Sequence, residues 1–274
     1  MRDDLEILIA TMNQTSLDFL LPIFPHQHFS EFHILILNQT TEGKDLESNY
    51  PKVRVVNSYE RGLSKSRNLA IKHAQRKIAL LADDDVVYTP DFEKAITDAF
   101  EKNTEASIIT FNHQRIGSKT PHKDYVNEFE HTLKSVWKVS SIEIAFRVED
   151  IKNRAIFFDE NFGLGASFES AEEFLFLRQA IKSNLKVMFC PKVIVSHPLL
   201  SSGVMEGSDD LVYARSALFY KTKGILGYLW LLKYMFFLLR KGNIQVSQLF
   251  AKLNVGLTGI KKYKQITISD KTKI

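Results

Sequence analysis

The sequence predicts an α/β protein with a mostly parallel central sheet flanked by helices, followed by an amphipathic helical appendage at the C-terminus. Short apolar runs alternate with amphipathic stretches over most of the chain, and a basic, strongly apolar stretch follows near its end. With 274 residues, of which 45% are hydrophobic, the chain is long enough to bury one sizeable core. One α/β domain with an appendage is therefore expected.

Short apolar runs that end in polar turns mark the expected strands. They are Leu5–Ala10, His33–Leu37, Val53–Val56, Ile78–Ala82, Ala106–Phe111, Ile142–Arg147, Lys186–Phe189 and Val193–Val195. Helices are expected from Ser64, from Pro90-Asp91 to about Lys102, and over Ala171–Ser183, because Ser and Pro favour helix starts. The polar residues 112–126 are predicted to form a mobile loop.

The formal net charge of +4 is unevenly distributed along the chain. From Leu211 onward there are 12 Lys/Arg and one acid, a balance of +11, which leaves 24 Lys/Arg against 31 Asp/Glu, or −7, in residues 1–210. We therefore expect two regions with different tasks, 1–210 and 211–274. The single cysteine, Cys190, and the lack of a secretory signal in residues 1–25 predict a cytoplasmic protein.

The stretch Ile225–Leu239 is apolar except for Lys233. It is shorter than the roughly 20 residues that cross a hydrocarbon core. We predict a helix in the plane of a membrane, with flanking cations bound to anionic head groups (Lys221, Lys223, Arg240 and Lys241). The alternative is a core helix packed on the domain. No nucleic-acid partner is expected, because such aliphatic density does not suit phosphates or bases.

Three consecutive carboxylates, Asp83-Asp84-Asp85, directly follow the predicted strand Ile78–Ala82. Like charges this close raise each other's pKa unless a cation neutralises them. Because ligands of open α/β sheets bind beyond the carboxyl ends of the strands, a divalent ion is predicted here. Strand alternation makes Asp83 and Asp85 a pair and sets Asp84 apart. The alternative is a solvated acidic strand end or helix cap.

Three further motifs are candidates for function. The segment from Arg61 to Asn68 combines a glycine turn, a helix start and three cations, which suits a diphosphate or, alternatively, an exposed basic helix. Glu172 and Glu173 lie in the first turn of an apolar helix, where one of them can serve as a general base. His197 ends a strand and is a candidate metal ligand, although a lone histidine is more often structural.

Taken in order, these motifs resemble the inverting family 2 glycosyltransferases, whose Rossmann-like nucleotide-binding fold is called GT-A. The resemblance runs from Leu5 to about Leu200. It comprises Thr11-Met12-Asn13, Arg61-Gly62 with Ser64, Arg67 and Asn68, the Leu-Ala-Asp-Asp-Asp segment, Asp159-Glu160 before a glycine-containing loop, and Glu172-Glu173. It implies transfer of a sugar from a nucleotide-diphosphate sugar to a hydroxyl group with inversion.

The resemblance also implies a role for each matched residue. Asp85 is the preferred ligand of Mg²⁺ or Mn²⁺, with Asp83 and His197 as further ligands, and Asp83 or Asp84 lies near the ribose. Thr11 and Asn13 line the nucleotide pocket, while Arg61 and Arg67 lie near the ribose and phosphates. Glu173 is the catalytic base. The sequence departs from the family at Asn38-Gln39-Thr40-Thr41, where an acid often contacts the nucleobase; the Asn38 amide can still bind a base, but UDP cannot be assumed.

Within this scheme, residues 1–111 bind the nucleotide sugar and residues 112–210 the acceptor, with His113, Arg115, His122, Tyr125 and Trp137 as candidate contacts. A lipid-linked glycan acceptor of cell-surface polysaccharide synthesis is expected at the inner face of the plasma membrane, with residues 221–264 on its anionic surface. One alternative is a sugar-1-phosphate nucleotidyltransferase, for which a glycine-rich loop would be expected after the first strand. The other is a non-catalytic, membrane-associated nucleotide-sugar-binding protein.

Overall fold

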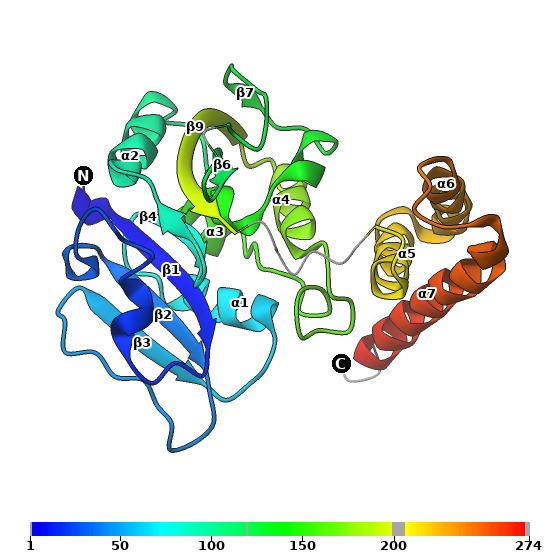
Figure 1. Ribbon diagram of the computed structural model, residues 1–274, viewed down its shortest axis with the longest axis horizontal. Helices are drawn as coiled ribbons and strands as arrows, with labels where there is room; N and C mark the ends of the chain where they lie inside the picture. The colour runs from blue at the N-terminus through cyan, green and yellow to red at the C-terminus, as the bar shows by residue number, and fades with distance from the viewer. Residues whose placement is uncertain (1, 119, 199–205, 272–274) are drawn as a thin grey trace. The chain divides into compact units, whose positions relative to one another are not determined.

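The computed structural model describes residues 2–118, 120–198 and 206–271 (Figure 1). The chain forms two compact units. The first, here called the sheet unit, comprises Met1–Asp159 and Glu172–Ser201; the second, the helical unit, comprises Glu160–Ala171 and Ser202–Ile274. The predicted boundary after Asp210 thus falls inside a helix of the helical unit, and this unit also takes a short segment from the middle of the chain.

A nine-stranded sheet forms the centre of the sheet unit, in the order β3-β2-β1-β4-β8-β6-β9-β5 with β7 beside β9. Its strands are β1 (Leu5–Met12), β2 (Ile34–Gln39), β3 (Val53–Ser58), β4 (Ile78–Asp83), β5 (Val87–Tyr88), β6 (Ile108–Arg115), β7 (Phe129–Glu130), β8 (Ile144–Arg147) and β9 (Val187–His197). Strands β1 to β4 are mutually parallel, whereas β8 runs antiparallel to both β4 and β6. The predicted α/β class with a central sheet is confirmed.

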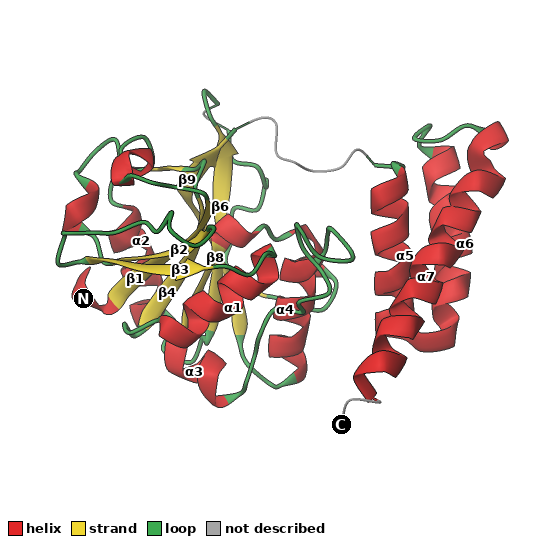
Figure 2. Ribbon diagram, turned by 90° about the horizontal axis from the view of Figure 1, so that it is seen from below, coloured by secondary structure: helices red, strands yellow, loops and turns green. Residues whose placement is uncertain are grey.

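Helices cover both faces of this sheet (Figure 2). They are α1 (Leu63–His73), α2 (Phe92–Lys102), α3 (Val148–Asn153) and α4 (Glu172–Lys182). Ile7 and Ile9 of β1 belong to the core on the α2 side, and Leu8 belongs to the core formed with α1, α3 and α4. A strand buried on both faces needs a continuous apolar run, which explains the composition of β1. Short 3₁₀ helices lie at Arg2–Asp4, Leu17–Leu20, Phe29–Glu31, Ser135–Lys138 and Ser141–Glu143.

The helical unit contains α5 (Asp209–Lys223), α6 (Gly227–Arg240) and α7 (Leu249–Lys271), with 3₁₀ turns at Gly224–Leu226 and Val246–Gln248. By length and composition alone, Asp209–Arg240 could cross a membrane. However, Gly224 has a φ of 59° and divides this run into α5 and α6, which pack together with the rings of Phe219 and Tyr234 5.6 Å apart. The predicted C-terminal helical appendage is therefore present as a helical hairpin followed by α7.

Two local predictions differ from the structure. The two strands expected at Lys186–Phe189 and Val193–Val195 are one strand, β9, because its pairing with β6 shifts register and accommodates the intervening residues. The loop predicted as mobile over 112–126 is anchored. Its Lys123 is buried, and the carbonyl oxygen of Lys123 accepts a hydrogen bond from the Asn112 side chain at 2.8 Å.

Candidate active site

The carboxyl ends of β1, β2 and β4 meet at one edge of the sheet. Thr11 pairs in register with Asn38, and the neighbouring Ala10 pairs with Asp83. Parallel strands place their carboxyl ends together, and this edge is where ligands bind in open α/β sheets. The structure therefore brings the predicted nucleotide-pocket residues and the acidic triplet to one place.

Each acid of the triplet contacts a different partner. Asp83 accepts hydrogen bonds from Arg67 at 3.0 Å and from Ser141 at 3.3 Å. Asp84 accepts a hydrogen bond from the Thr11 hydroxyl, and Asp85 lies near His197. β4 ends at Asp83 and the chain turns at the next two residues, so strand alternation does not extend to Asp85. The pairing of Asp83 with Asp85 at a metal ion stays a prediction.

Arg67 gathers three carboxylates around one buried guanidinium. Besides Asp83, its Nη1 donates to Glu172 at 3.4 Å and lies 3.6 Å from an oxygen of Glu173. The side chain of Arg67 is only 3% exposed, so these carboxylates screen it from solvent. A buried guanidinium needs such partners, and the arrangement ties α1 to the end of β4 and to the start of α4. The predicted contact between Arg67 and a donor stays a prediction.

Glu173 has the electrostatic environment of a general base. Burial raises the pKa of its carboxyl group to about 8, with the charge of Glu172 adding to the rise and the charge of Arg67 opposing it. Its side chain retains 20% exposure, whereas the Glu172 side chain is buried. A base whose pKa lies near the working pH is effective in proton transfer. Of the two acids, Glu173 is therefore the one that combines access with a perturbed pKa.

Asp85 and His197 form the part of the site that fits a divalent metal. His197 Nε2 lies 3.4 Å from Asp85 Oδ1, and the Asp85 side chain is 49% exposed. His197 Nδ1 lies 2.9 Å from the Pro198 carbonyl oxygen, which fits a tautomer protonated at Nδ1 with Nε2 left to coordinate. Within the described residues no cluster of three or more metal-binding side chains occurs. Mg²⁺ is commonly held by one or two protein groups together with substrate phosphates, so this pair fits the ion.

Asn38, predicted to contact a nucleobase, is held by hydrogen bonds within the protein, and its contact with a base stays a prediction. Its side chain is fully buried, accepts a hydrogen bond from the Gln14 amide, and donates to the Gln14 carbonyl and to Asn57. The amide thus makes three hydrogen bonds to two residues, and both N–H donors are used within the protein. Asn38 fixes the loop after β1, in which Asn13 is exposed with a φ of 57°. Asn13 and Arg61, which is also exposed, are accessible to a donor.

The candidate acceptor contacts are dispersed. His113 is buried, with Nδ1 2.8 Å from Glu143, and the His122 ring stacks on it at 4.4 Å. Arg115 is exposed at the end of β6, and Tyr125 is exposed beside Phe129 and Phe189. Only Trp137 lies against the helix that carries Glu173, with its ring 4.7 Å from that of Phe174.

Sequence reasoning did not foresee the roles of Ser141, Glu172 and Asn68. Ser141 supports Asp83, and the buried Glu172 binds Arg67. The Asn68 side chain donates to the Phe158 carbonyl at 2.9 Å and accepts from the Phe158 amide at 2.7 Å, joining α1 to the chain ahead of the glycine-containing loop. The motif from Arg61 to Asn68 was the sequence signal that could have indicated a role for Asn68. The sequence holds no signal that indicates a role for Ser141.

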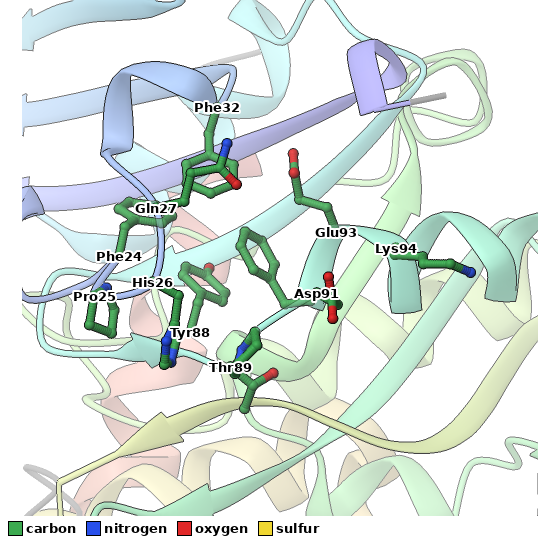
Figure 3. A pocket seen from close by; sticks show the side chains of 12 residues that line it. Phe24, Pro25, His26, Gln27, Phe32, Tyr88, Thr89, Asp91, Glu93 and Lys94 are labelled. Carbon is green, nitrogen blue, oxygen red and sulfur yellow. The ribbon is translucent and has the colours of Figure 1, made fainter.

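A separate pocket lies between the loop after β1 and the start of α2 (Figure 3). It is lined by Phe24, Pro25, His26, Gln27, Phe32, Tyr88, Thr89, Pro90, Asp91, Phe92, Glu93 and Lys94. The rings of Tyr88 and Phe92 stack 4.2 Å apart in its wall. None of the predicted site residues lines this pocket, so it is distinct from the acidic cluster.

Residues 26–150, slightly less than half of the chain, match the model of the family described as Glycosyl transferase family 2. No curated protein matches the chain. Among solved structures, the crystal structure of S. aureus TarS 1–349 aligns with a TM-score of 0.61 at 15% identity and covers 95% of this chain and 91% of that one. TarS 1–349 in complex with UDP-GlcNAc aligns with a TM-score of 0.58 at 14% identity, over the same shares of both chains.

A longer TarS chain aligns with a TM-score of 0.54 at 17% identity, over 79% of this chain. This chain spans 39% of the length of that one. At these identities the structural likeness establishes the fold, which is that of the GT-A enzymes.

Proposed function

We propose that the chain, whose residues 26–150 match the family 2 model and whose fold is GT-A, is a family 2 glycosyltransferase. In this proposal it transfers a sugar, with inversion and with the help of a divalent metal, from a nucleotide-diphosphate sugar to a hydroxyl group of a glycan acceptor. The observation that carries this proposal is the convergence of Asp83, Glu172 and Glu173 on Arg67, beside the pair formed by Asp85 and His197. This convergence supports a charged donor and a proton acceptor at one site.

In the proposed reaction, Glu173 removes the proton of the acceptor hydroxyl group. The oxygen attacks the anomeric carbon as the bond from that carbon to the nucleoside diphosphate breaks, so a single displacement inverts the configuration. Arg67 holds Glu173 in place, and the exposed Arg61 is available to the diphosphate. Glu173 needs to be ionised for this step, and its raised pKa gives it the basicity to accept the proton.

Mg²⁺ or Mn²⁺ would be held by Asp85 and His197. The ion supplies a positive charge that stabilises the departing diphosphate. Asp83 is a weaker candidate ligand, because Arg67 and Ser141 already bind its two oxygens. Asp84, which accepts a hydrogen bond from Thr11, is proposed to contact a ribose hydroxyl group.

The donor is proposed to be a uridine-diphosphate sugar. A structurally similar protein, TarS 1–349, is known as a complex with UDP-GlcNAc and as a complex with UDP. UDP-GlcNAc is therefore the first donor to test.

The acceptor is proposed to be lipid-linked and to be reached from a membrane surface. Seven apolar side chains of the turn before α6 and of α6 itself are exposed, here called the apolar face: Ile225, Leu226, Leu229, Trp230, Leu232, Phe236 and Phe237. Exposed cations at Lys223, Lys233 and Lys241 accompany them. Apolar side chains framed by cations suit a helix lying in an anionic lipid surface, and a peripheral location at the inner face of the plasma membrane follows.

The test is donor turnover by the purified protein with UDP-GlcNAc and Mn²⁺, measured as UDP release, with a panel of other nucleotide sugars beside it. Glu173→Gln should lower turnover about 10²- to 10⁴-fold and leave UDP binding intact. Asp85→Ala should abolish the stabilisation of the protein by UDP with Mn²⁺ in thermal unfolding. Wild-type turnover in both variants would refute these assignments, and pyrophosphate release from a sugar 1-phosphate with a nucleoside triphosphate would indicate the nucleotidyltransferase reaction instead.

A further inference from the structure

We propose that residues 160–171 are a positioning segment for the catalytic base, held by the helical unit through Phe162 and Phe168. The inference rests on the proposed role of Glu173. The segment leaves the sheet unit after Asp159, packs within the helical unit, and returns to the sheet unit at Glu172. The pair Glu172-Glu173 therefore directly follows a segment that packs with the C-terminal helices.

Two phenylalanine rings anchor the segment in the helical unit. Phe162 and Phe168 are fully buried, and their ring centroids lie 4.9 Å apart. The Phe168 ring lies 5.3 Å from that of Tyr213 on α5, and both phenylalanine rings lie 6.2 Å from that of Tyr263 on α7. Because α5 and α7 each supply one ring, the anchor depends on both helices.

The segment is stiffened by its own backbone hydrogen bonds. The amide of Gly163 donates to the Phe168 carbonyl at 2.8 Å, and the amide of Phe168 donates to the Asn161 carbonyl at 3.0 Å. The Ser170 amide also donates to the Phe168 carbonyl, at 2.8 Å. A displacement of the Phe168 ring is therefore transmitted to the residues directly before α4.

Both ends of the segment are attached to α1. Asn68 holds Phe158 ahead of the segment through two hydrogen bonds, and Arg67 holds Glu172 and Glu173 behind it. Between the segment and α4, Ala171 has a φ of 72°, a conformation that non-glycine residues adopt only when their surroundings impose it. In the chain, the ring anchor lies on one side of Ala171 and the contacts of Arg67 with Glu172 and Glu173 lie on the other, so both bear on its conformation.

The consequence is that the helical unit contributes to catalysis in addition to any binding of a membrane. A base has to lie within hydrogen-bond reach of the proton it removes, and a displacement of about 1 Å can cost about 10²-fold in rate. Phe162 and Phe168 are thus positioning residues for Glu173.

The test uses the full-length protein with Trp230→Phe, which leaves Trp137 as its only tryptophan. The Trp137 ring rests on Phe174, the residue after Glu173, so its fluorescence reports on the start of α4. In this background, Phe168→Ala should lower kcat for UDP release from UDP-GlcNAc about 10- to 100-fold and change the Trp137 emission, with the donor KM unchanged. Phe168→Leu keeps an apolar side chain in the anchor. Its kcat and its Trp137 emission should therefore be close to those of the parent protein.

The matched control is Phe250→Ala, because Phe250 is on α7 of the same unit but is 78% exposed. It should change neither kcat nor the emission. If Phe168→Ala does not fold, Tyr263→Ala removes the same ring contact from the side of α7 and carries the same expectations. Wild-type kcat and emission in the folded anchor variant would overturn the proposal.

The proposed function can fail independently of this proposal. If the parent protein turns over no nucleotide sugar, the Trp137 emission and the hydrogen exchange of the amides at the start of α4 still decide whether the anchor positions Glu173. Changed emission and faster exchange in Phe168→Ala alone would support the positioning role, and unchanged values would refute it.

Discussion

At the scale of single residues, Arg67 is the centre of the candidate site. One buried guanidinium there faces the carboxylates of Asp83, Glu172 and Glu173. Removing it leaves three acids with their main cationic partner gone, in a region of low solvent access, and such a loss is costly.

Arg67→Ala is therefore expected to lower the free energy of unfolding by about 3–5 kcal/mol, measured by urea denaturation. Arg61→Ala is the control, because Arg61 is exposed and forms no ion pair with any residue that the structure describes; its effect should stay within about 0.5 kcal/mol. Equal stability of the two variants would show that the carboxylates do not depend on Arg67.

The raised pKa of Glu173 predicts the pH dependence of the reaction. A base acts in its ionised form, so kcat should rise with pH through about 8, the pKa of Glu173, and then level off. Glu172→Gln removes a neighbouring negative charge, which favours ionisation of Glu173 and should move the midpoint to lower pH. Glu105→Gln, at an exposed position, should leave the midpoint unchanged. A midpoint that is the same in all three proteins would contradict this assignment.

For the candidate site residues, the sequence indicated their positions in the fold better than it indicated their partners. Asp83, Asp84 and Asp85 could be placed at the end of a strand from the apolar run before them, but the turn that sends each acid to a different partner has no signature in the sequence. The hydrogen bonds of Asn38 were not predictable for a related reason. A buried amide and an exposed one look alike in a sequence, and only the backbone of Gln14 shows which of them Asn38 is.

At the scale of elements, parallel strands and helices were predictable because each needs a continuous or periodic apolar pattern. β1, β2 and β4 were expected from such runs, and the structure extends each by one or two residues. The short strands β5 and β7 were not expected. With two residues each, they depend on pairing with β9 and carry no pattern of their own.

The apolar face of α6 leads to a prediction at this scale. Leu229→Ser combined with Phe236→Ser should reduce partitioning onto vesicles that contain an anionic lipid about 100-fold, because two large apolar side chains no longer leave water. Co-sedimentation with phosphatidylglycerol vesicles measures the effect, and phosphatidylcholine vesicles give the uncharged reference. Leu257→Ser is the control, since Leu257 is exposed on α7. Equal binding of the double variant and the parent protein would remove the membrane proposal.

At the scale of the whole molecule, the helical unit is discontinuous in sequence. The charge contrast indicated a separate C-terminal region, but nothing in the sequence indicated that residues 160–171 pack with it. Phe162 and Phe168 look like ordinary core residues of the first domain. Their partners, Tyr213 and Tyr263, lie far along the chain, where a pattern of local spacing cannot reach.

Truncation after Asp210 is therefore expected to do more than weaken membrane binding. It removes both tyrosines and leaves the rings of Phe162 and Phe168 without cover, so the soluble yield should fall and the binding of a hydrophobic dye should rise several-fold. Adding Phe162→Ser and Phe168→Ser to the truncated protein should return dye binding to the full-length level. If the truncated protein without these substitutions binds no more dye than the full-length protein, Phe162 and Phe168 do not depend on the helical unit for cover.

The discontinuous helical unit also affects how the protein is made. During synthesis, domains fold as their residues emerge, and the segment with Phe162 and Phe168 emerges well before Tyr213 and Tyr263. The strands and α1 can assemble early, but Phe162 and Phe168 gain the ring contacts of Tyr213 and Tyr263 only when α5 and then α7 have left the ribosome. A nascent or prematurely terminated chain would thus have its sheet, with the proposed donor site, before the proposed base Glu173 is in position. Catalytic competence would then be the last property that the chain acquires.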